Sequence, residues 1–127
     1  MQGKSEESRE GGGRAGPRIT VVVVTYQSSS TVERTLAPLR QRCLQGLLRC
    51  VVVDNCSTDG TVEILRREAS WLELVEGKQN LGYGNACNRG WVLAMTPYVL
   101  FLNPDASLDE QSLRTLDRKS TRLNSSH

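Results

Sequence analysis

The sequence predicts an α/β fold built on a parallel sheet, and two observations support this. Short runs of aliphatic and β-branched residues recur along the chain, at residues 19–25, 48–53 and 98–102, and they are too short to be helices. Stretches with apolar residues at helical spacing separate these runs. Because the first run is continuous and apolar on both faces, it resembles a parallel strand that is covered on both sides. Strands that alternate with helices in this way imply a parallel sheet with crossover connections.

The first half of the chain contains two expected strands and two expected helices. Residues 19–25 (ITVVVVT) form the first strand, and residues 48–53 form the second, which ends at Asp54. A helix is predicted between them by one apolar stripe, formed by Val32, Leu36, Leu39 and Cys43. Residues 28–30 are serines that offer N-cap oxygens to this helix. Pro38 lies inside it and is expected to kink or shorten it.

The second half continues the same alternation. Its expected elements are a turn at residues 55–60, a helix around 62–69, a strand at 71–75, a loop at 77–82, a helix at 85–94, a strand at 98–102 and the start of a further helix at 109–116. The order of elements is therefore β-α-β-α-β-α-β, followed by a helix.

The two ends of the chain differ from its middle. Residues 1–18 are rich in Gly, Ser, Glu and Arg, without periodic apolar positions, and we expect them to be a disordered leader. Residues 117–127 (DRKSTRLNSSH) resemble the in-frame translation of a sequencing-library adapter. We therefore expect one globular part at residues 19–116 and a non-native tail after it. A natural polar tail is the alternative.

Composition and charge exclude several classes of protein. The formal net charge is +2, with 16 basic and 14 acidic residues, and residues 1–116 hold 13 of each. Such a balance predicts no binding to nucleic acid. No run of 18 apolar residues is present, so no transmembrane segment is expected. The four cysteines match no zinc-binding pattern and are expected to be reduced thiols in a cytoplasmic protein.

Polar residues follow each expected strand where it ends. They are Thr25 and Tyr26, Asp54 and Asn55, Gln79 and Asn80, and Asn103 and Asp105. The carboxyl ends of parallel strands meet at one edge of the sheet, and ligands of open α/β sheets bind at that edge. The element order alone therefore predicts a ligand site there.

The segment VVVDNCSTDGT, at residues 51–61, contains two acids with different expected roles. Asp59 and Gly60 fit a turn that caps the next helix. Asp54 ends a buried strand, where we do not expect its carboxylate to cap a turn or helix. Its carboxylate and the amide of Asn55 could instead hydrogen-bond a planar ring.

Two further segments suggest a phosphate-bearing ligand. The segment NLGYGNACNRG, at residues 80–90, contains glycines and side-chain amides directly before and at the start of an expected helix. Backbone N–H groups at a helix N-terminus favour an anion. Arg89 could bind that anion or be a solvated helix residue. YVLFLNPDA, at residues 98–106, places Asn103 and Asp105 two residues apart, so that their oxygens could hold a hard cation. A turn that caps the next helix is the alternative there.

Together these segments resemble a known family. VVVVTYQSSSTVERTL, VVVDNCSTDGT, NLGYGNACNRGW and FLNPDA occur in this order at residues 21–106. They are similar to the N-terminal half of family-2 glycosyltransferases, most of all the rhamnosyltransferase-like branch. The resemblance implies the nucleotide-diphospho-sugar transferase (GT-A, Rossmann-like) fold, of which only the N-terminal half is present. It also implies a divalent cation, Mg²⁺ or Mn²⁺, and inverting transfer of a hexosyl or rhamnosyl group to an acceptor hydroxyl.

The resemblance also implies roles for individual residues. Those expected to bind the nucleotide-sugar donor are Thr25, Tyr26, Asp54, Asn55, Asn80, Gly82, Asn88, Arg89 and Asn103. Of these, Thr25 and Tyr26 would line the base and ribose pocket, and Asp54 would contact the base. Asp105 would hold the metal. The family commonly has an acid where this chain has Asn103, and an amide is a weaker metal ligand.

The implied activity needs parts that this chain does not contain. In the family the general base follows the metal motif, so no catalytic residue is expected within residues 1–127, and the chain itself is expected to be inactive. The implied partners are a nucleotide-diphospho-sugar donor and a glycan or lipid-linked acceptor, as in cell-wall or polysaccharide biosynthesis. The expected location is cytoplasmic. A position at the periphery of a membrane is compatible with this, because lipid-linked acceptors lie there.

Two other functions are compatible with the same element order. One is a non-catalytic nucleotide-binding module of the same fold. The other is a receiver-like signalling domain, which needs an acidic pair after the first strand, where this chain has Thr25, Tyr26 and Gln27. That difference counts strongly against the receiver.

Overall fold

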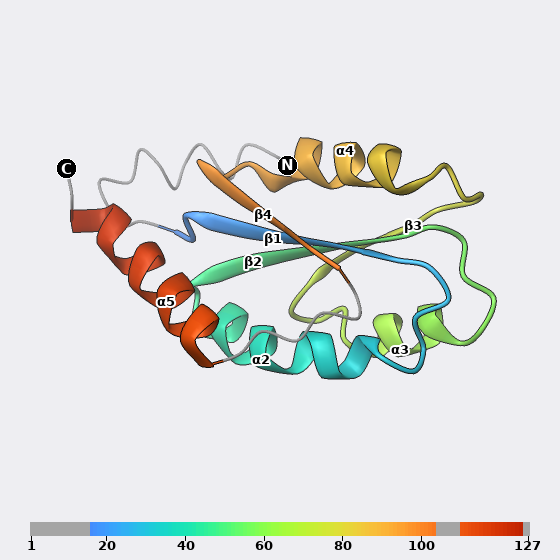
Figure 1. The fold of residues 1–127 in the computed structure, drawn as a ribbon, viewed down its shortest axis with the longest axis horizontal. Coiled ribbons are helices and arrows are strands. Elements are labelled where there is room, and N and C mark those ends of the chain that lie inside the picture. The colour runs from blue at the N-terminus through green and yellow to red at the C-terminus, as the bar shows by residue number, and fades with distance from the viewer. Residues whose placement is uncertain (1–15, 104–109, 126–127) are drawn as a thin grey trace.

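The computed structural model describes residues 16–103 and 110–125, and it shows a three-layer α/β arrangement (Figure 1). The elements, in chain order, are β1 (Ile19–Thr25), α2 (Val32–Leu44), β2 (Leu48–Asp54), α3 (Thr61–Arg67), β3 (Glu73–Glu76), α4 (Tyr83–Ala94), β4 (Tyr98–Leu102) and α5 (Glu110–Ser125). Helix α4 lies on one side of the sheet, and α2 and α3 lie on the other.

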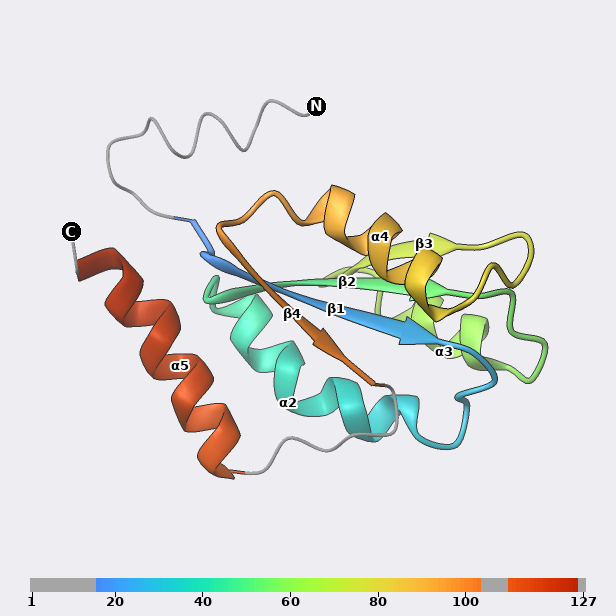
Figure 2. The same ribbon diagram turned by 45° about the horizontal axis from the view of Figure 1, so that its top comes forward.

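The four strands form one parallel sheet in the order β3-β2-β1-β4. Strand β1 pairs with β2 from Ile19 opposite Leu48 to Thr25 opposite Asp54, and β4 pairs with the other side of β1. The view in Figure 2 shows β4 crossing in front of β1 at the open side of the sheet. This register brings the carboxyl ends of β1, β2 and β3 to one edge.

The side chains of β1 alternate between two cores. Val21 and Val23 face a cluster shared with α2 and α3, while Val22 and Val24 face a smaller cluster shared with α4. All seven residues of β1 are buried. The prediction that this strand is covered on both faces is therefore confirmed, because an apolar side chain on either face finds a helix to pack against.

The C-terminal end of helix α4 accepts hydrogen bonds from side chains of the sheet. The Thr20 hydroxyl donates to the Ala94 carbonyl at 3.0 Å. The Arg49 guanidinium donates to the Leu93 carbonyl at 3.0 Å and also to the Ala94 carbonyl. The last carbonyls of a helix have no partner within the helix, and a cation there also complements the helix dipole. These contacts fix the direction in which the N-terminus of α4 points.

Several expected boundaries differ from the structure. Strand β3 covers Glu73–Glu76, two residues later at its start than expected, because residues 68–71 form turns and Leu72 a bend. Helix α2 begins after Thr31, which makes no side-chain cap. The serines do not cap it with their hydroxyls either; the Ser28 carbonyl accepts the Val32 N–H at 2.9 Å instead. Pro38 lies within α2 without ending it.

The last helix is longer than expected. The helix that was expected to start within residues 109–116 is α5, and it does not break off where the expected tail begins but continues to Ser125. Leu116 packs against the core shared with α2. Arg42 of α2 donates to both carboxylate oxygens of Asp117, at 2.7 and 3.1 Å. The first residue of the tail thus contacts the folded part.

None of the helices in the described parts of the chain has the length and apolar character needed to cross a bilayer.

Candidate functional site

The ends of β1 and β2 are joined by a buried carboxylate. The side chain of Asp54 is inaccessible to solvent, as is that of Thr25. Asp54 Oδ1 accepts the Thr25 hydroxyl at 2.6 Å and the Ser57 hydroxyl at 2.7 Å. Its Oδ2 accepts the Ser57 backbone N–H at 2.8 Å. A buried carboxylate is tolerated when its oxygens accept several hydrogen bonds in this way.

This geometry corrects one expectation about Asp54. We expected no capping work for an acid at this strand end, but its carboxylate closes the turn that follows β2 through Ser57. Contact between Asp54 and a nucleotide base is not tested by the structure and stays a prediction. In the arrangement described, such a contact requires a movement that exposes the carboxylate.

The side chain of Asn55 joins this edge to the loop that precedes α4. Asn55 is nearly buried. Its amide donates to the Gly82 carbonyl at 3.2 Å, and its oxygen accepts the Leu81 N–H at 3.4 Å. The side chain of Asn80 in turn accepts the Gly82 N–H at 2.8 Å. Gly82 has a φ of 92°, which a glycine adopts without strain. The loop before α4 is therefore held against the end of β2.

Gly77, a residue that the sequence did not single out, lets the backbone after β3 come close to the backbone at the end of β2. Its N–H donates to the Asp54 carbonyl at 2.8 Å. A Cβ at position 77 would lie 2.7 Å from that carbonyl oxygen and 3.6 Å from Arg89 Nη1. The guanidinium of Arg89 thus lies beside the turn after β3, at the edge where the strands end. The only signal in the sequence was a glycine directly after a strand.

The N-terminus of α4 points toward the same edge (Figure 1). Its N-cap residue is Gly82, no side chain caps it, and its first turn contains no acid. The first N–H groups and the positive end of the helix dipole are therefore available to an anion. This arrangement fits the phosphate-binding role that the sequence suggested for the loop.

The remaining predicted residues lie at the surface. Tyr26 is 51% exposed, and Asn88, Arg89 and Asn103 are exposed as well. The structure brings Thr25, Asp54, Asn55, Asn80 and Gly82 together through hydrogen bonds. Within the described part of the chain, no hydrogen bond joins these residues to Asn88 or Asn103. Asp105 lies outside the described residues.

The described part of the chain does not by itself form a cation site. It contains no group of three or more His, Cys, Asp or Glu side chains that could hold a metal ion. Both carboxylate oxygens of Asp54 are occupied by hydrogen bonds. Asn103 offers a single amide oxygen at the end of β4, which is a weak ligand set for a divalent cation.

The loops after β1 and β2 are also linked through Asp59. Asp59 Oδ2 accepts the Ser29 N–H at 3.1 Å, and Oδ1 accepts the Thr61 N–H at 3.1 Å. Thr61 accepts the Ser28 N–H at 2.9 Å. Gly60, the N-cap residue of α3, has a φ of 99°. Asp59 therefore forms the expected turn at the start of α3 by accepting the first helical N–H, whereas Gly60, the N-cap residue, makes no side-chain cap.

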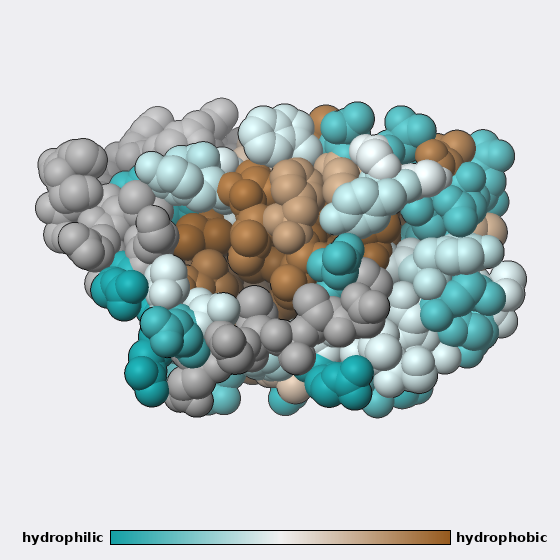
Figure 3. All heavy atoms as spheres, viewed as in Figure 1, coloured by the Kyte–Doolittle hydropathy of each residue, from teal (hydrophilic) through white to brown (hydrophobic). Residues whose placement is uncertain are grey.

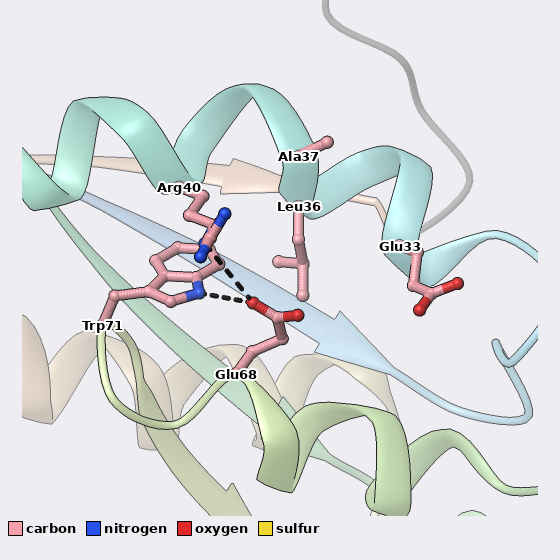
Figure 4. A pocket seen from close by; sticks show the side chains of 6 residues that line it. All are labelled: Glu33, Leu36, Ala37, Arg40, Glu68 and Trp71. Carbon is pink, nitrogen blue, oxygen red and sulfur yellow. Dashed lines mark hydrogen bonds and ion pairs between the residues drawn. The ribbon is translucent and has the colours of Figure 1, made fainter.

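A pocket of about 210 Å³ lies elsewhere, between α2 and the segment after α3 (Figure 4). It is lined by Glu33, Leu36, Ala37, Arg40, Glu68 and Trp71. The indole N–H of Trp71 donates to Glu68 Oε1 at 2.6 Å, and Arg40 Nε lies 3.8 Å from the same oxygen. Arg40, Glu68 and Trp71 thus pair with one another, and Glu33 lies 4.0 Å from Arg67 Nη2.

Comparison with known proteins connects this arrangement to sugar transfer. The chain matches Glycosyl transferase family 2 over residues 20–122. Uncharacterized glycosyltransferases of Mycobacterium bovis and Mycobacterium tuberculosis are each 32% identical to it over 102 residues. That match covers 80% of this chain and 43% of each relative. The chain thus spans less than half the length of these curated relatives.

Solved structures share the fold. Staphylococcus aureus TarS superimposes with a TM-score of 0.70 at 25% identity, over 83% of this chain and 32% of TarS. A mannosyltransferase from Pyrobaculum calidifontis, solved with GDP-Man and Mn²⁺, gives a TM-score of 0.68 at 29% identity. It covers 84% of this chain and 32% of that protein. The four-stranded parallel sheet is therefore part of the GT-A fold, and the chain belongs to glycosyl transferase family 2.

Proposed function

We propose that this chain is the donor-binding part of a glycosyltransferase that uses a nucleotide-diphospho-sugar. The observation that carries the proposal is the joining of three loops at one sheet edge. The loops after β1, β2 and β3 are connected there through Thr25, Asp54 and Asn55. The mannosyltransferase that shares the fold was solved with GDP-Man, which supports a donor of this chemical class.

The positions of the exposed groups suggest how such a donor is held. The ring of Tyr26, half exposed beside the ends of β1 and β2, offers a flat apolar surface for the base. The diphosphate would lie against the uncapped N-terminus of α4. Arg89 lies next to Gly77 at that edge and would add a charge-assisted contact to a phosphate oxygen. Asn80 and Gly82 shape the loop between these two regions.

A divalent cation is a further part of the proposal. Asp105 is the residue proposed to hold it, with Asn103 beside it in the sequence, and the mannosyltransferase contains Mn²⁺. A cation bound to the diphosphate would neutralise charge on the leaving group. The described residues alone do not form a complete cation site.

The finer features of the reaction are proposals as well. We propose that the whole protein transfers a hexosyl or rhamnosyl group to a glycan or lipid-linked acceptor with inversion. The chain spans less than half of its curated relatives, and its described acids at the edge are engaged in hydrogen bonds. We therefore expect residues 1–127 to bind the donor nucleotide without transferring sugar. A cytoplasmic location, at or near a membrane, belongs to the same proposal.

Calorimetric titration with UDP, GDP and dTDP tests the donor site. Replacing Arg89 by Met should weaken the binding of the preferred diphosphate about tenfold, the loss expected for one charge-assisted contact. It should change the binding of the corresponding nucleoside much less. The control is Arg34→Met, since Arg34 is exposed on α2.

Three further results would bear on the proposal. A cation that strengthens binding to the wild-type chain but not to the Asp105→Asn variant supports the metal assignment. Equal diphosphate affinity of the wild type and the Arg89→Met variant contradicts the placement of the diphosphate. Sugar transfer by the purified 127-residue chain contradicts the expected inactivity.

A further inference from the structure

Gln27, a residue that the family resemblance did not assign, links the loop after β1 to the loop after β2. The Thr58 backbone N–H donates to Gln27 Oε1 at 2.6 Å, and the Thr58 hydroxyl donates to the same oxygen at 3.3 Å. In the other direction, the Gln27 backbone N–H donates to Ser57 Oγ at 2.9 Å. Gln27 therefore binds two successive residues of the second loop, through its backbone and through its side chain.

These contacts continue to the buried carboxylate of Asp54. Ser57, which accepts the N–H of Gln27, donates its own hydroxyl to Asp54 Oδ1 at 2.7 Å and its N–H to Oδ2 at 2.8 Å. The Thr25 hydroxyl reaches the same carboxylate directly. The ends of β1 and β2 are thus connected through Thr25 inside the molecule and through Gln27 at the surface, in addition to the links through Asp59 and Thr61.

The backbone of Gln27 adopts an uncommon conformation. Its φ is 51°, in the left-handed region that residues with a side chain rarely enter. Such conformations persist where surrounding contacts hold them, and they concentrate at functional sites. Here the contacts are those to Ser57 and Thr58. Because Gln27 directly follows Tyr26, its conformation sets how the chain turns away from the exposed tyrosine ring.

We propose that Gln27 is a positioning residue for nucleotide binding. Its side-chain oxygen holds the loop of residues 55–60 in place, so that this loop and Tyr26 present one preformed surface. The proposal rests on the proposed function, since it takes a nucleotide as the ligand of this surface. A loop that is already ordered need not be ordered on binding, and this raises affinity. The oxygen is the decisive group because both bonds from Thr58 end on it.

Two variants of similar side-chain length separate this oxygen from the bulk of the side chain. Gln27→Met removes the acceptor, whereas Gln27→Glu keeps an acceptor oxygen at the same reach. Gln41→Met is the matched control, because Gln41 is exposed on α2. Far-ultraviolet circular dichroism of each variant verifies that the fold is retained.

Amide hydrogen exchange at Thr58, followed by NMR on the full chain without nucleotide, measures the contact itself. We expect Gln27→Met to accelerate this exchange by about fivefold or more, because the N–H loses its acceptor. Gln27→Glu and Gln41→Met should leave the rate within about twofold of the wild type. Unchanged exchange in the Gln27→Met variant overturns the proposal.

Titration with UDP and GDP measures the consequence for binding. We expect Gln27→Met to weaken the preferred nucleotide about five- to tenfold, as for one lost hydrogen bond, and Gln27→Glu to retain most of the affinity. Faster exchange with unchanged affinity overturns the positioning role. A wild-type chain that binds neither nucleotide overturns the proposed function and this role together, while the exchange rates still decide whether Gln27 holds the loop.

Discussion

At the scale of single residues, the exposed carboxylate of Asp59 links two loops through hydrogen bonds. Its oxygens accept hydrogen bonds from Ser29 on one side and from Thr61 on the other. These bonds, the one from the Thr61 hydroxyl foremost, hold the pKa of the Asp59 carboxyl well below its ordinary value. A group whose pKa is lower in the folded state stabilises the fold above its unfolded pKa, about 3.9 for Asp. That contribution is lost as the pH falls toward the folded pKa.

The resulting prediction concerns acid stability. We expect Asp59→Asn to lower the free energy of unfolding at pH 6, and we expect the difference from the wild type to shrink as the pH falls below about 4. Urea unfolding at pH values between 6 and 3 measures this. Glu63→Gln, on the exposed side of the adjoining helix α3, should show a smaller dependence. A difference between Asp59→Asn and the wild type that stays constant over this range would contradict the assigned hydrogen bonds.

The same loop shows what the sequence could predict at this scale. The capping role of Asp59 was predictable, because its partners Thr61 and Gly60 are neighbours in the sequence. The role of Asp54 was not, since Thr25 lies 29 residues away and meets it only once β1 and β2 pair. The link through Gln27 was missed for the same reason. Contacts that depend on strand register leave no signal in the local sequence.

At the scale of elements, the packing of α4 on β1 depends on a residue without a side chain. Gly90 is buried against Val22, and an added Cβ would collide with Val22 Cγ1. Gly84 lies on the same helix, but nothing stands within 4 Å of the position that its Cβ would take. The two glycines therefore form a matched pair, one in tight contact with the sheet and one facing open space.

Replacing each glycine by alanine should have opposite effects. We expect Gly90→Ala to destabilise the fold by about 1–3 kcal/mol, because the helix must move away from β1. Gly84→Ala should stabilise it by up to about 1 kcal/mol, because alanine favours the helix. Urea unfolding of both variants measures the two free energies. Equal effects would show that the close approach at Gly90 is not needed.

Most elements were predictable because their signals are local. The bounds of β1 and β4 agree with their apolar runs, and α2 follows its apolar stripe. Helix α5 was harder, since residues 117–125 are mostly polar and carry no apolar stripe of their own. The contacts that accompany its extension, Leu116 against the core and Asp117 with Arg42, are made across the fold.

At the scale of the whole molecule, β4 is the edge strand of the described sheet with the least protection against pairing with another chain. It pairs with β1 on one side, and no other described strand pairs with it. Its sequence, YVLFL, contains no charged residue or proline, although such residues commonly protect strand edges from pairing with other chains. Leu100 and Phe101 are 36% and 40% exposed. Figure 3 shows apolar side chains gathered in the middle of the face where β4 lies in Figure 1.

An apolar edge that no other described strand pairs with predicts self-association of the chain. We expect its average mass in sedimentation velocity experiments to rise with concentration, because a second edge can supply the missing backbone partners. Phe101→Lys should shift the distribution toward the monomer, since a charge at the edge opposes pairing. Leu44→Lys is the control: Leu44 is 63% exposed at the end of α2, so the same change adds the same charge away from β4. If both lysine variants reduce association equally, net charge rather than the edge controls it. A wild-type chain that stays monomeric at every concentration would show that the edge is protected in solution.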